Sequence, residues 1–276
     1  MEARCTLTKL KYHLKTKIEK RMRKIKTFLV LTVLALTMPN GMSAGNAIDS
    51  LQMKARLGYN LGGTAPVGIP TTIRSIDAYR LTPSLMVGFD VMLPLQQNWG
   101  VMAGLRIENK GMDADVTTKG YHMEMKKGSD QIEGLFTGHI KQDVTEWMLT
   151  LPVELTYQVS QKVMLKGGPY ASLLLSKDFS GIASDGYLRQ GDPTGPKILI
   201  GDKEGEWATY DFSDDMRRLQ YGIGLGVDWQ LYRQLGLSAD LNWGLNGIFK
   251  SSFKTIEQSL FPIYGTIGVF YRLDKR

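Results

Sequence analysis

The sequence predicts an all-β protein, an eight-stranded antiparallel up-and-down transmembrane β-barrel. Three observations lead to this fold class. Apolar and polar residues alternate in eight segments, the connections between these segments alternate between short and long, and aromatic residues gather at both ends of the apolar faces. Together these features are typical of barrels that cross a bilayer with strands.

Each of the eight segments has the pattern of a membrane-spanning strand. In the first segment Leu57 and Tyr59 share one face while Arg56 and Asn60 share the other, because successive side chains of a strand point to opposite sides. A spanning strand needs about 9–11 residues. In chain order the segments cover residues 51–62, 84–93, 100–108, 146–157, 162–175, 218–229, 235–244 and 261–272.

The connections between the segments also alternate. Short turns fall near residues 97–98, 160–161 and 233–234, and long polar segments join the other strands. Outer-membrane barrels have short periplasmic turns and long external loops. The first long segment, residues 62–80, is unusually apolar, so we expect it either to fold back over the barrel mouth or to be a mobile loop. Its apolar residues are Pro66, Val67, Ile69, Pro70, Ile73 and Ile76.

Aromatic residues test the direction of the strands independently. With the first strand running outward, five aromatics fall at the outer ends of the apolar faces and four at the inner ends. Trp147 and Tyr157 are ten residues apart, which at ~3.3 Å per residue and ~45° tilt covers about 24 Å, close to the ~25 Å apolar band of such barrels. The outer set is Tyr59, Trp147, Tyr221, Trp243 and Phe261, and the inner set is Trp99, Tyr157, Trp229 and Tyr271.

The polar faces are expected to line the barrel interior. A soluble lipocalin-like barrel would instead place its apolar face inside, but these polar faces carry both signs of charge among many glycines, and two aromatic girdles indicate a lipid surface. An eight-stranded barrel is just wide enough to be filled by side chains, so we expect a salt-bridged plug and no large-solute pore. The charged residues are Arg56, Asp90, Arg106, Glu108, Glu154, Lys166, Arg218, Asp228 and Asp240.

The N-terminal region has the features of a secretory signal peptide. Four Lys/Arg residues precede an apolar run over residues 28–38, and small residues follow it. This run is too short for a spanning helix, which needs about 20 residues. We expect cleavage near Ser43 or Ala47 and a true start at Met22.

This leader carries the basic charge of the chain. Of 34 Lys/Arg and 27 Asp/Glu, residues 1–47 hold ten and two, which leaves 24 and 25 for residues 48–276 and a net charge near −1. Nucleic-acid binding therefore loses its compositional support. Cys5 is the only cysteine, so no disulfide or cysteine metal site is expected after the leader. The chain thus divides into an N-terminal extension with a cleaved signal peptide, 1–47, and an outer-membrane β-barrel domain, 48–276.

Two glycine motifs have structural explanations. Gly222, Gly224 and Gly226 resemble the start of a dinucleotide fingerprint, but they lie inside a strand pattern that no helix follows. The turn-rich stretch from Gly191 to Lys197 lacks the Gly-Lys-Ser/Thr ending of a phosphate loop. No cofactor is expected.

No catalytic residues are assigned either. Outer-membrane proteases, lipases and deacylases need a base, usually histidine, near a nucleophile or water. After the leader only His122 and His139 are available, and solvated positions in the segment between the third and fourth strands explain both. A weak divalent-cation site is an alternative use of that segment, with mixed surface charge as the default explanation. Its carboxylates are Asp113, Asp115, Glu124, Asp130 and Glu133.

Five stretches of the sequence resemble the PorT-like outer-membrane β-barrel family of Bacteroidetes. They are residues 58–63, 149–155, 167–170 and 268–273, and the segment with Pro66, Pro70, Ile73, Arg74 and Ile76. The resemblance implies an eight-stranded barrel inserted by the barrel-assembly machinery. For the namesake of the family it implies participation in type IX secretion, a role that is not general to such barrels and is not transferred.

These predictions describe a non-enzymatic integral protein of the bacterial outer membrane, reached after export through the inner membrane. Its external loops would serve binding, adhesion, or secretion and assembly as an accessory component. The alternative is a small-solute transport or conductance barrel, and a surface enzyme comes third. The expected partners are outer-membrane lipid and the barrel-assembly machinery, with secretion components as a further candidate.

Overall fold

The computed structural model describes residues 50–66, 70–82, 84–253, 255–256 and 259–273. The predicted signal peptide, its cleavage site and Cys5 lie outside the described residues, as do Val67 and Ile69. The elements are β1 (Gln52–Pro66), β2 (Ile73–Leu81), β3 (Leu85–Pro94), β4 (Trp99–Lys127), β5 (Asp130–Gln158), β6 (Val163–Gln190), β7 (Lys197–Ile200), β8 (Ala208–Asp211), the 3-10 helix η1 (Ser213–Asp215), β9 (Leu219–Tyr232), β10 (Leu235–Gly244) and β11 (Leu260–Arg272).

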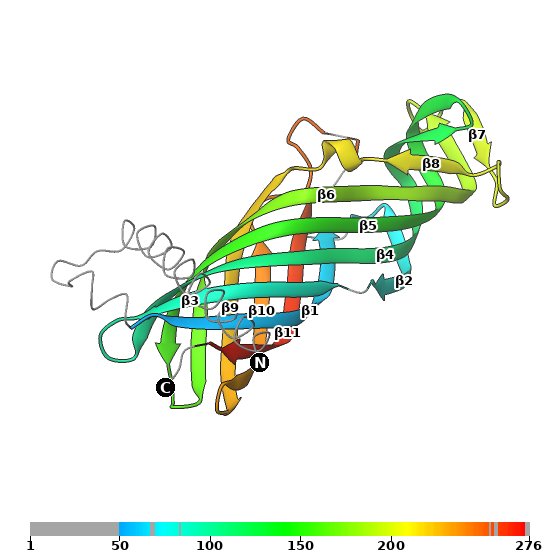
Figure 1. The fold of residues 1–276 in the computed structure, drawn as a ribbon. Coiled ribbons are helices and arrows are strands. Elements are labelled where there is room, and N and C mark those ends of the chain that lie inside the picture. The colour runs from blue at the N-terminus through cyan, green and yellow to red at the C-terminus, as the bar shows by residue number, and fades with distance from the viewer. Residues whose placement is uncertain (1–49, 67–69, 83, 254, 257–258, 274–276) are drawn as a thin grey trace, which may run out of the picture. The chain divides into compact units, whose positions relative to one another are not determined.

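Eight antiparallel strands close into a ring (Figure 1). Their order is β1, β3, β4, β5, β6, β9, β10 and β11, and β11 pairs back onto β1 with Asn60 opposite Thr266. Each ring strand pairs with its neighbours along the chain, so the topology is up-and-down and the predicted fold class is confirmed. Within the described part of the chain, no helix is both long and apolar enough to cross a membrane.

The two faces of the ring have opposite polarity. Large apolar side chains such as Leu105, Leu151 and Leu225 are exposed on the outside, whereas charged side chains such as Arg56 and Asp228 are buried inside. Eight of the nine predicted girdle aromatics are exposed, and Phe261 is half-buried. An outer face of this kind suits acyl chains, because in water it would be a very large apolar patch.

The short connections also follow the prediction. Gln97 and Arg233 take left-handed backbone conformations, with φ of 59° and 46°, in the turns before β4 and β10. Non-glycine residues adopt this conformation mostly in tight turns. The connections at this end of the barrel are therefore as short as expected.

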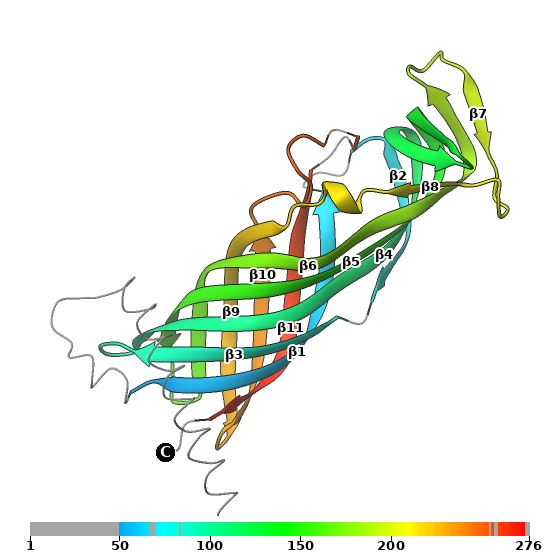
Figure 2. The ribbon, with the colours of Figure 1, turned by 45° about the horizontal axis from the view of Figure 1, so that its top comes forward.

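Three strands continue far past the barrel at the opposite end. Figures 1 and 2 show β4, β5 and β6 running well beyond β9, β10 and β11. We call this region, residues 73–81, 111–145 and 177–217, the extension. It also contains β2 on the edge of β4, and β8, which pairs with β6 and reaches the tip of β4 where Lys126 lies opposite Thr209.

This finding corrects the prediction of long polar loops for these segments. The alternation does not stop at the membrane, but the two faces exchange their polarity. On β4 the inward side changes from Arg106 and Glu108 to Met112 and Val116, while Asp113 takes the outward side. The extension thus has an apolar interior, as the sheets of soluble proteins do, whereas the barrel below it has a polar interior and an apolar outer face.

A continuous apolar core fills the extension. The hairpin between β4 and β5 turns at Gly128, where φ of +63° favours glycine. Irregular pairing after Thr118 and after Thr137 bends the hairpin, so that its tip comes back to β8. The buried core includes Tyr121, Met123, Met125, Phe136, Ile140, Val144, Phe179, Ala183, Leu188, Ala208, Tyr210 and Phe212.

Candidate functional site

The barrel interior holds a balanced network of buried charges. Asp228 is its centre, because its carboxylate lies 2.9 Å from Lys54 Nζ, 2.6 Å from Arg56 Nη2 and 3.3 Å from Lys166 Nζ. Lys166 Nζ also lies 2.6 Å from Asp240 Oδ1. An unpaired buried charge is costly, so equal numbers of both signs are needed here. The four cations are Lys54, Arg56, Arg106 and Lys166, and the four carboxylates are Asp90, Glu154, Asp228 and Asp240.

The predicted salt-bridged plug is therefore confirmed, although two of the nine predicted residues lie outside this network. Glu108 is buried in a separate ion pair, 3.1 Å from Lys110 Nζ. Arg218 precedes β9 and its side chain is exposed, so it does not join the plug. The glycines expected in the interior are also explained, since a Cβ on Gly226 would lie 2.0 Å from Asp240 Oδ1 and 2.7 Å from Lys166 Cε. The three-glycine motif that contains Gly226 lies within β9, and Gly226 makes room for the network.

Apolar side chains bound the charged network at both ends. Near the short turns Met92, Met102 and Met164 pack together. At the outer mouth both Thr64 Oγ1 and Tyr79 Oη lie against Met112 Sδ, at 3.6 and 3.7 Å. Methionine fills irregular gaps well, because its side chain is flexible. The same buried apolar cluster, which joins the core of the extension to the barrel, includes Met148, Leu174, Met216, Ile248 and Leu260.

An apolar cavity of about 290 Å³ lies inside the extension. Its wall comes from segments far apart in the sequence, among them β2, β4, β5, β8 and the start of β11. Ile73 and Ile76 of the first long segment are among its lining residues. Residues 73–81 form the edge strand β2 beside β4, and Ile76 is largely exposed, so the described part of this segment is a strand that forms a side wall and not a mobile loop. Other lining residues are Met112, Val116, Tyr121, Met123, Ile140, Phe179, Ile256 and Leu260.

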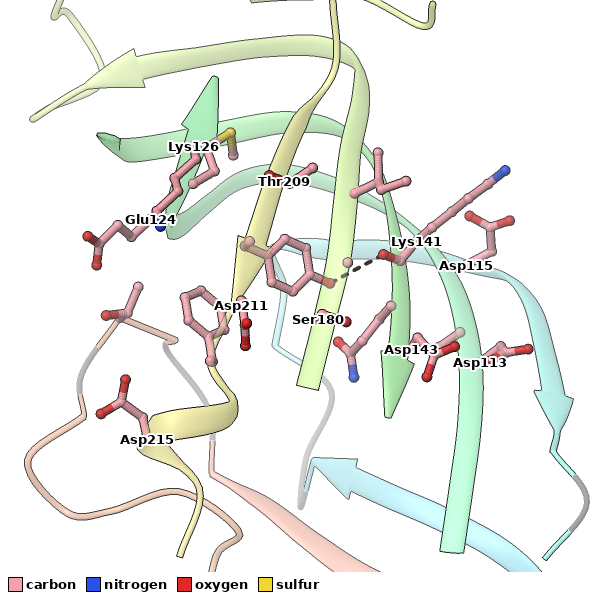
Figure 3. A pocket seen from close by; sticks show the side chains of 18 of the residues that line it. Asp113, Asp115, Glu124, Lys126, Lys141, Asp143, Ser180, Thr209, Asp211 and Asp215 are labelled. Carbon is pink, nitrogen blue, oxygen red and sulfur yellow. Dashed lines mark hydrogen bonds between the residues drawn. The ribbon is translucent and has the colours of Figure 1, made fainter. Parts of the chain in front are cut away.

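A second, more polar cavity of about 890 Å³ adjoins the first (Figure 3). Four residues line both, namely Ala114, Gln142, Tyr210 and Phe212. Tyr210 donates a hydrogen bond of 3.4 Å to the carbonyl of Lys141. Its ring lies 5.2 Å from that of Phe212. The two cavities thus share an aromatic wall.

Negative charge prevails around the larger cavity. Figure 3 shows Asp113, Asp115 and Asp143 on one flank and Glu124 and Asp215 on the other. With Asp211 these make six carboxylates, against three cations among the lining residues. The cations are Arg80, Lys126 and Lys141.

Two of these carboxylates oppose each other directly. Asp113 of β4 faces Asp143 of β5 across the strand pair, an arrangement that destabilises a sheet. Burial, and then the charge of Asp113, raise the pKa of Asp143. Asp211 behaves differently, because hydrogen bonds from the Ser213 hydroxyl and backbone N–H lower its pKa.

The structure separates the two histidines. His139 Nδ1 lies 3.1 Å from the Thr117 hydroxyl, but that hydroxyl donates its single proton to Asp77 Oδ2 at 2.5 Å. His122 lies 3.2 Å from the Thr255 carbonyl and 3.5 Å from Glu133. Neither histidine lines the two cavities. The Thr117 hydroxyl thus does not donate its proton to His139, as a nucleophile activated by a histidine base would.

The five carboxylates considered for a cation site do not form one cluster, because Asp113, Asp115 and Glu124 line the larger cavity and Asp130 and Glu133 do not. Asp113 and Asp115 lie near the base of the extension, and Asp130 and Glu133 lie near the hairpin tip. Across the described ranges no group of three or more His, Cys, Asp or Glu side chains is placed to hold a metal ion. The turn that follows Gly191 joins β6 to β7, in agreement with the turn prediction there.

Comparison with known proteins identifies the barrel. A family model described as an outer membrane protein beta-barrel domain matches residues 43–250. No curated protein sequence matches the chain. Similar solved structures include Ail of Yersinia pestis (11% identity, 81% of this chain and 99% of that chain, TM-score 0.38), OprG of Pseudomonas aeruginosa (12%, 81% and 96%, 0.32) and the outer membrane protease OmpT of Escherichia coli (12%, 81% and 94%, 0.33). Similarity at this level carries no functional argument.

Proposed function

Because the chain belongs to the outer membrane protein β-barrel family, we propose that it is a non-enzymatic binding protein of the bacterial outer membrane that acts through its extension. The observation that carries the proposal is the pair of adjoining cavities in the extension, an apolar one of about 290 Å³ and a more open, charged one of about 890 Å³, at the long-loop end of the barrel. In outer-membrane barrels this end is external. A ligand would therefore bind from outside the cell.

The geometry of the cavities supports this assignment. Small-molecule sites are commonly concave, mostly apolar and about 300–1,000 Å³ in volume, with a few polar groups that orient the ligand. The smaller cavity is apolar with Gln142 and Thr118 among its polar lining residues, and the larger cavity supplies charged side chains beside it.

The barrel interior gives less support to the alternative, a transport or conductance barrel. The network around Asp228 fills the lumen with paired charges, and the cluster around Met112 covers its outer end. A conducting path would have to displace both. The separate surroundings of His122 and His139 are the corresponding support for a non-enzymatic role.

We also infer a place for the protein among PorT-like barrels. Four of the five matching stretches, residues 58–63, 149–155, 167–170 and 268–273, lie on β1, β5, β6 and β11, with Leu273 just after β11, and the fifth reaches β2 of the extension. Most of the likeness belongs to the barrel wall, so it supports insertion by the barrel-assembly machinery after export with the N-terminal leader. It supports no secretion role for the extension.

The binding proposal is tested with a small apolar probe, tryptophol, and the protein reconstituted in bilayer discs of zwitterionic lipid. Ala114 lines both cavities, so the larger side chain of Ala114→Phe should occupy their junction. Ala171→Phe makes the same change on the lipid-facing side of β6, where Ala171 is exposed. We expect saturable binding by ligand-observed NMR to the wild type and to Ala171→Phe, and loss of binding in Ala114→Phe. Equal binding in all three proteins would contradict the proposal.

Planar-bilayer recordings test the alternative on the same preparations. We expect no large, stable single-channel conductance from the wild type. If such a conductance appeared and Ala114→Phe left it unchanged, the lumen would be open and the transport role would be preferred.

A further inference from the structure

The chemistry of the two cavities also indicates which class of ligand they take. We infer that they bind a small organic cation with an apolar body, whose body occupies the 290 Å³ cavity and whose ammonium group lies among the carboxylates of the 890 Å³ cavity. This inference rests on the proposed binding function and adds the charge and shape of the ligand to it.

The apolar body is indicated by the walls of the smaller cavity. Ile73, Val116 and Ile140 face it from three strands, and Met112 and Met123 add flexible thioethers. Methionine-rich surfaces adapt to the shape of different apolar groups. A charged or strongly hydrated ligand would lose its hydration here without replacement, so the part of the ligand in this cavity is uncharged.

The position of the charged group is indicated by the junction of the cavities. Four residues line both spaces, so the two spaces adjoin at Ala114 and Gln142, and we place the end of the apolar body there. The lining of the larger cavity holds six carboxylates, on two flanks, and only three cations (Figure 3). A cleft lined mainly by one sign of charge concentrates ligands of the opposite sign.

Aromatic side chains at the junction point to the same class of ligand. Tyr210 and Phe212 line both cavities, and Phe253 lines the larger one. The Phe212 ring lies 5.2 Å from Tyr210 and 5.1 Å from Phe253, between centroids. Aromatic groups arranged around a site are used to recognise organic ammonium ions, because a ring face attracts a cation within about 6 Å.

The facing carboxylates Asp113 and Asp143 are consistent with this inference. Like charges directly opposite one another weaken a strand pair, and both residues line the larger cavity. A bound cation would offset their repulsion. The arrangement therefore lowers the stability of the empty protein and favours occupation of the cavity.

Three probes with the same indole body and different charge test the inference: tryptamine, which is a cation, tryptophol, which is neutral, and indole-3-acetate, which is an anion. With the full mature protein in zwitterionic bilayer discs at low salt, we expect tryptamine to bind most tightly and indole-3-acetate least tightly. Neutralising Asp113 and Asp143 together, as D113N/D143N, should weaken tryptamine binding by about two- to fivefold per charge and leave tryptophol unchanged. The control is Asp192→Asn, an exposed change in the turn between β6 and β7 that should alter none of the three affinities.

A second measurement does not depend on the folding of any variant. About 1 M salt reduces the screening length to roughly 3 Å, so the preference of the wild type for tryptamine over tryptophol should largely disappear. If tryptophol binds in an Ala114-dependent way but tryptamine binds no better at low salt, the ligand class is wrong and the binding function stands. If none of the three probes binds, both proposals fail.

Discussion

The charged network in the barrel gives the most quantitative prediction. Asp228→Asn removes one negative charge from a set of four cations and four carboxylates and changes the side-chain volume very little. Asp228 contacts three cations, at 2.9 Å from Lys54, 2.6 Å from Arg56 and 3.3 Å from Lys166. Breaking a buried ion pair on one side costs about 3–5 kcal/mol, since the remaining charge is left without compensation. We expect a loss of this size in the free energy of unfolding.

The loss is measured by reversible urea unfolding from lipid bilayers, followed by tryptophan fluorescence and by heat-modifiable migration on gels. Asp192→Asn is the control and should stay within about 0.5 kcal/mol of the wild type. Asp228 is the partner of Lys54 in the network, so the double variant D228N/K54M restores the balance of charge and should recover part of the loss. A cost below about 1 kcal/mol for Asp228→Asn would show that the lumen is hydrated enough to screen these charges, which would refute the packed-plug interpretation.

Three further predictions concern other parts of the molecule. Gly226→Val places a Cβ against Asp240 Oδ1 and should cost about 1–3 kcal/mol or more by overpacking, measured by the same urea unfolding. Asp143→Asn removes the repulsion from Asp113 and should stabilise the protein by roughly 0.2–1 kcal/mol. Because the pKa of Asp143 is raised in the folded state, its ionisation opposes folding above that pKa, so the gain should be present at neutral pH and vanish as the pH falls below the ordinary aspartate pKa; an unchanged gain at pH 3 would contradict this. Leu151→Arg, near the middle of the lipid-facing side of β5, should cost about 2–4 kcal/mol, whereas a neutral effect would place that side chain in water.

The barrel wall could be predicted from the sequence because every wall strand satisfies the same local rule. The alternation of apolar and polar residues, for example Leu149, Thr150 and Leu151, indicates which side chains face lipid and which face the barrel interior. The order of short and long connections then indicates the direction of the strands. The lumen network followed from the same rule, since charges on a walled-in face must be paired. Only its pairing partners, for example Asp228 with both Arg56 and Lys166, required the structure.

The extension could not be predicted in the same way, because its apolar side chains face inward and its polar side chains face outward, which is the reverse of the pattern in the barrel wall. Beyond Lys110 the inward face of β4 is apolar and the outward face is polar, so the segment looks polar and loop-like beside the lipid-facing strands. Irregular pairing after Thr118 then shifts the alternation by one position, and Tyr121 and Met123 continue the inward face. An apolar residue at every second position from Met112 to Val116 was the one signal available.

The cavities depend on contacts that no local pattern contains. β8 must reach the tip of β4, and β2 must join its edge, before Phe212 and Ile73 can line the same space. These pairings join segments separated by many residues. The candidate site therefore follows from the tertiary arrangement. In the sequence its charged and aromatic residues are scattered among segments that have the composition of polar loops, so nothing indicates that they line one space.

The orientation of the two strand faces is tested most directly by single-cysteine spin labelling across residues 147–157 of β5 in bilayers. Cys5 is the only cysteine of the chain and lies in the predicted leader, so each introduced cysteine is unique in the mature protein. We predict that labels at odd-numbered positions collide with lipid-dissolved oxygen, while labels at even-numbered positions are shielded from both oxygen and a water-soluble nickel complex. Strong collision of the odd-numbered labels with the nickel complex would place the apolar face in water and contradict the membrane-spanning barrel.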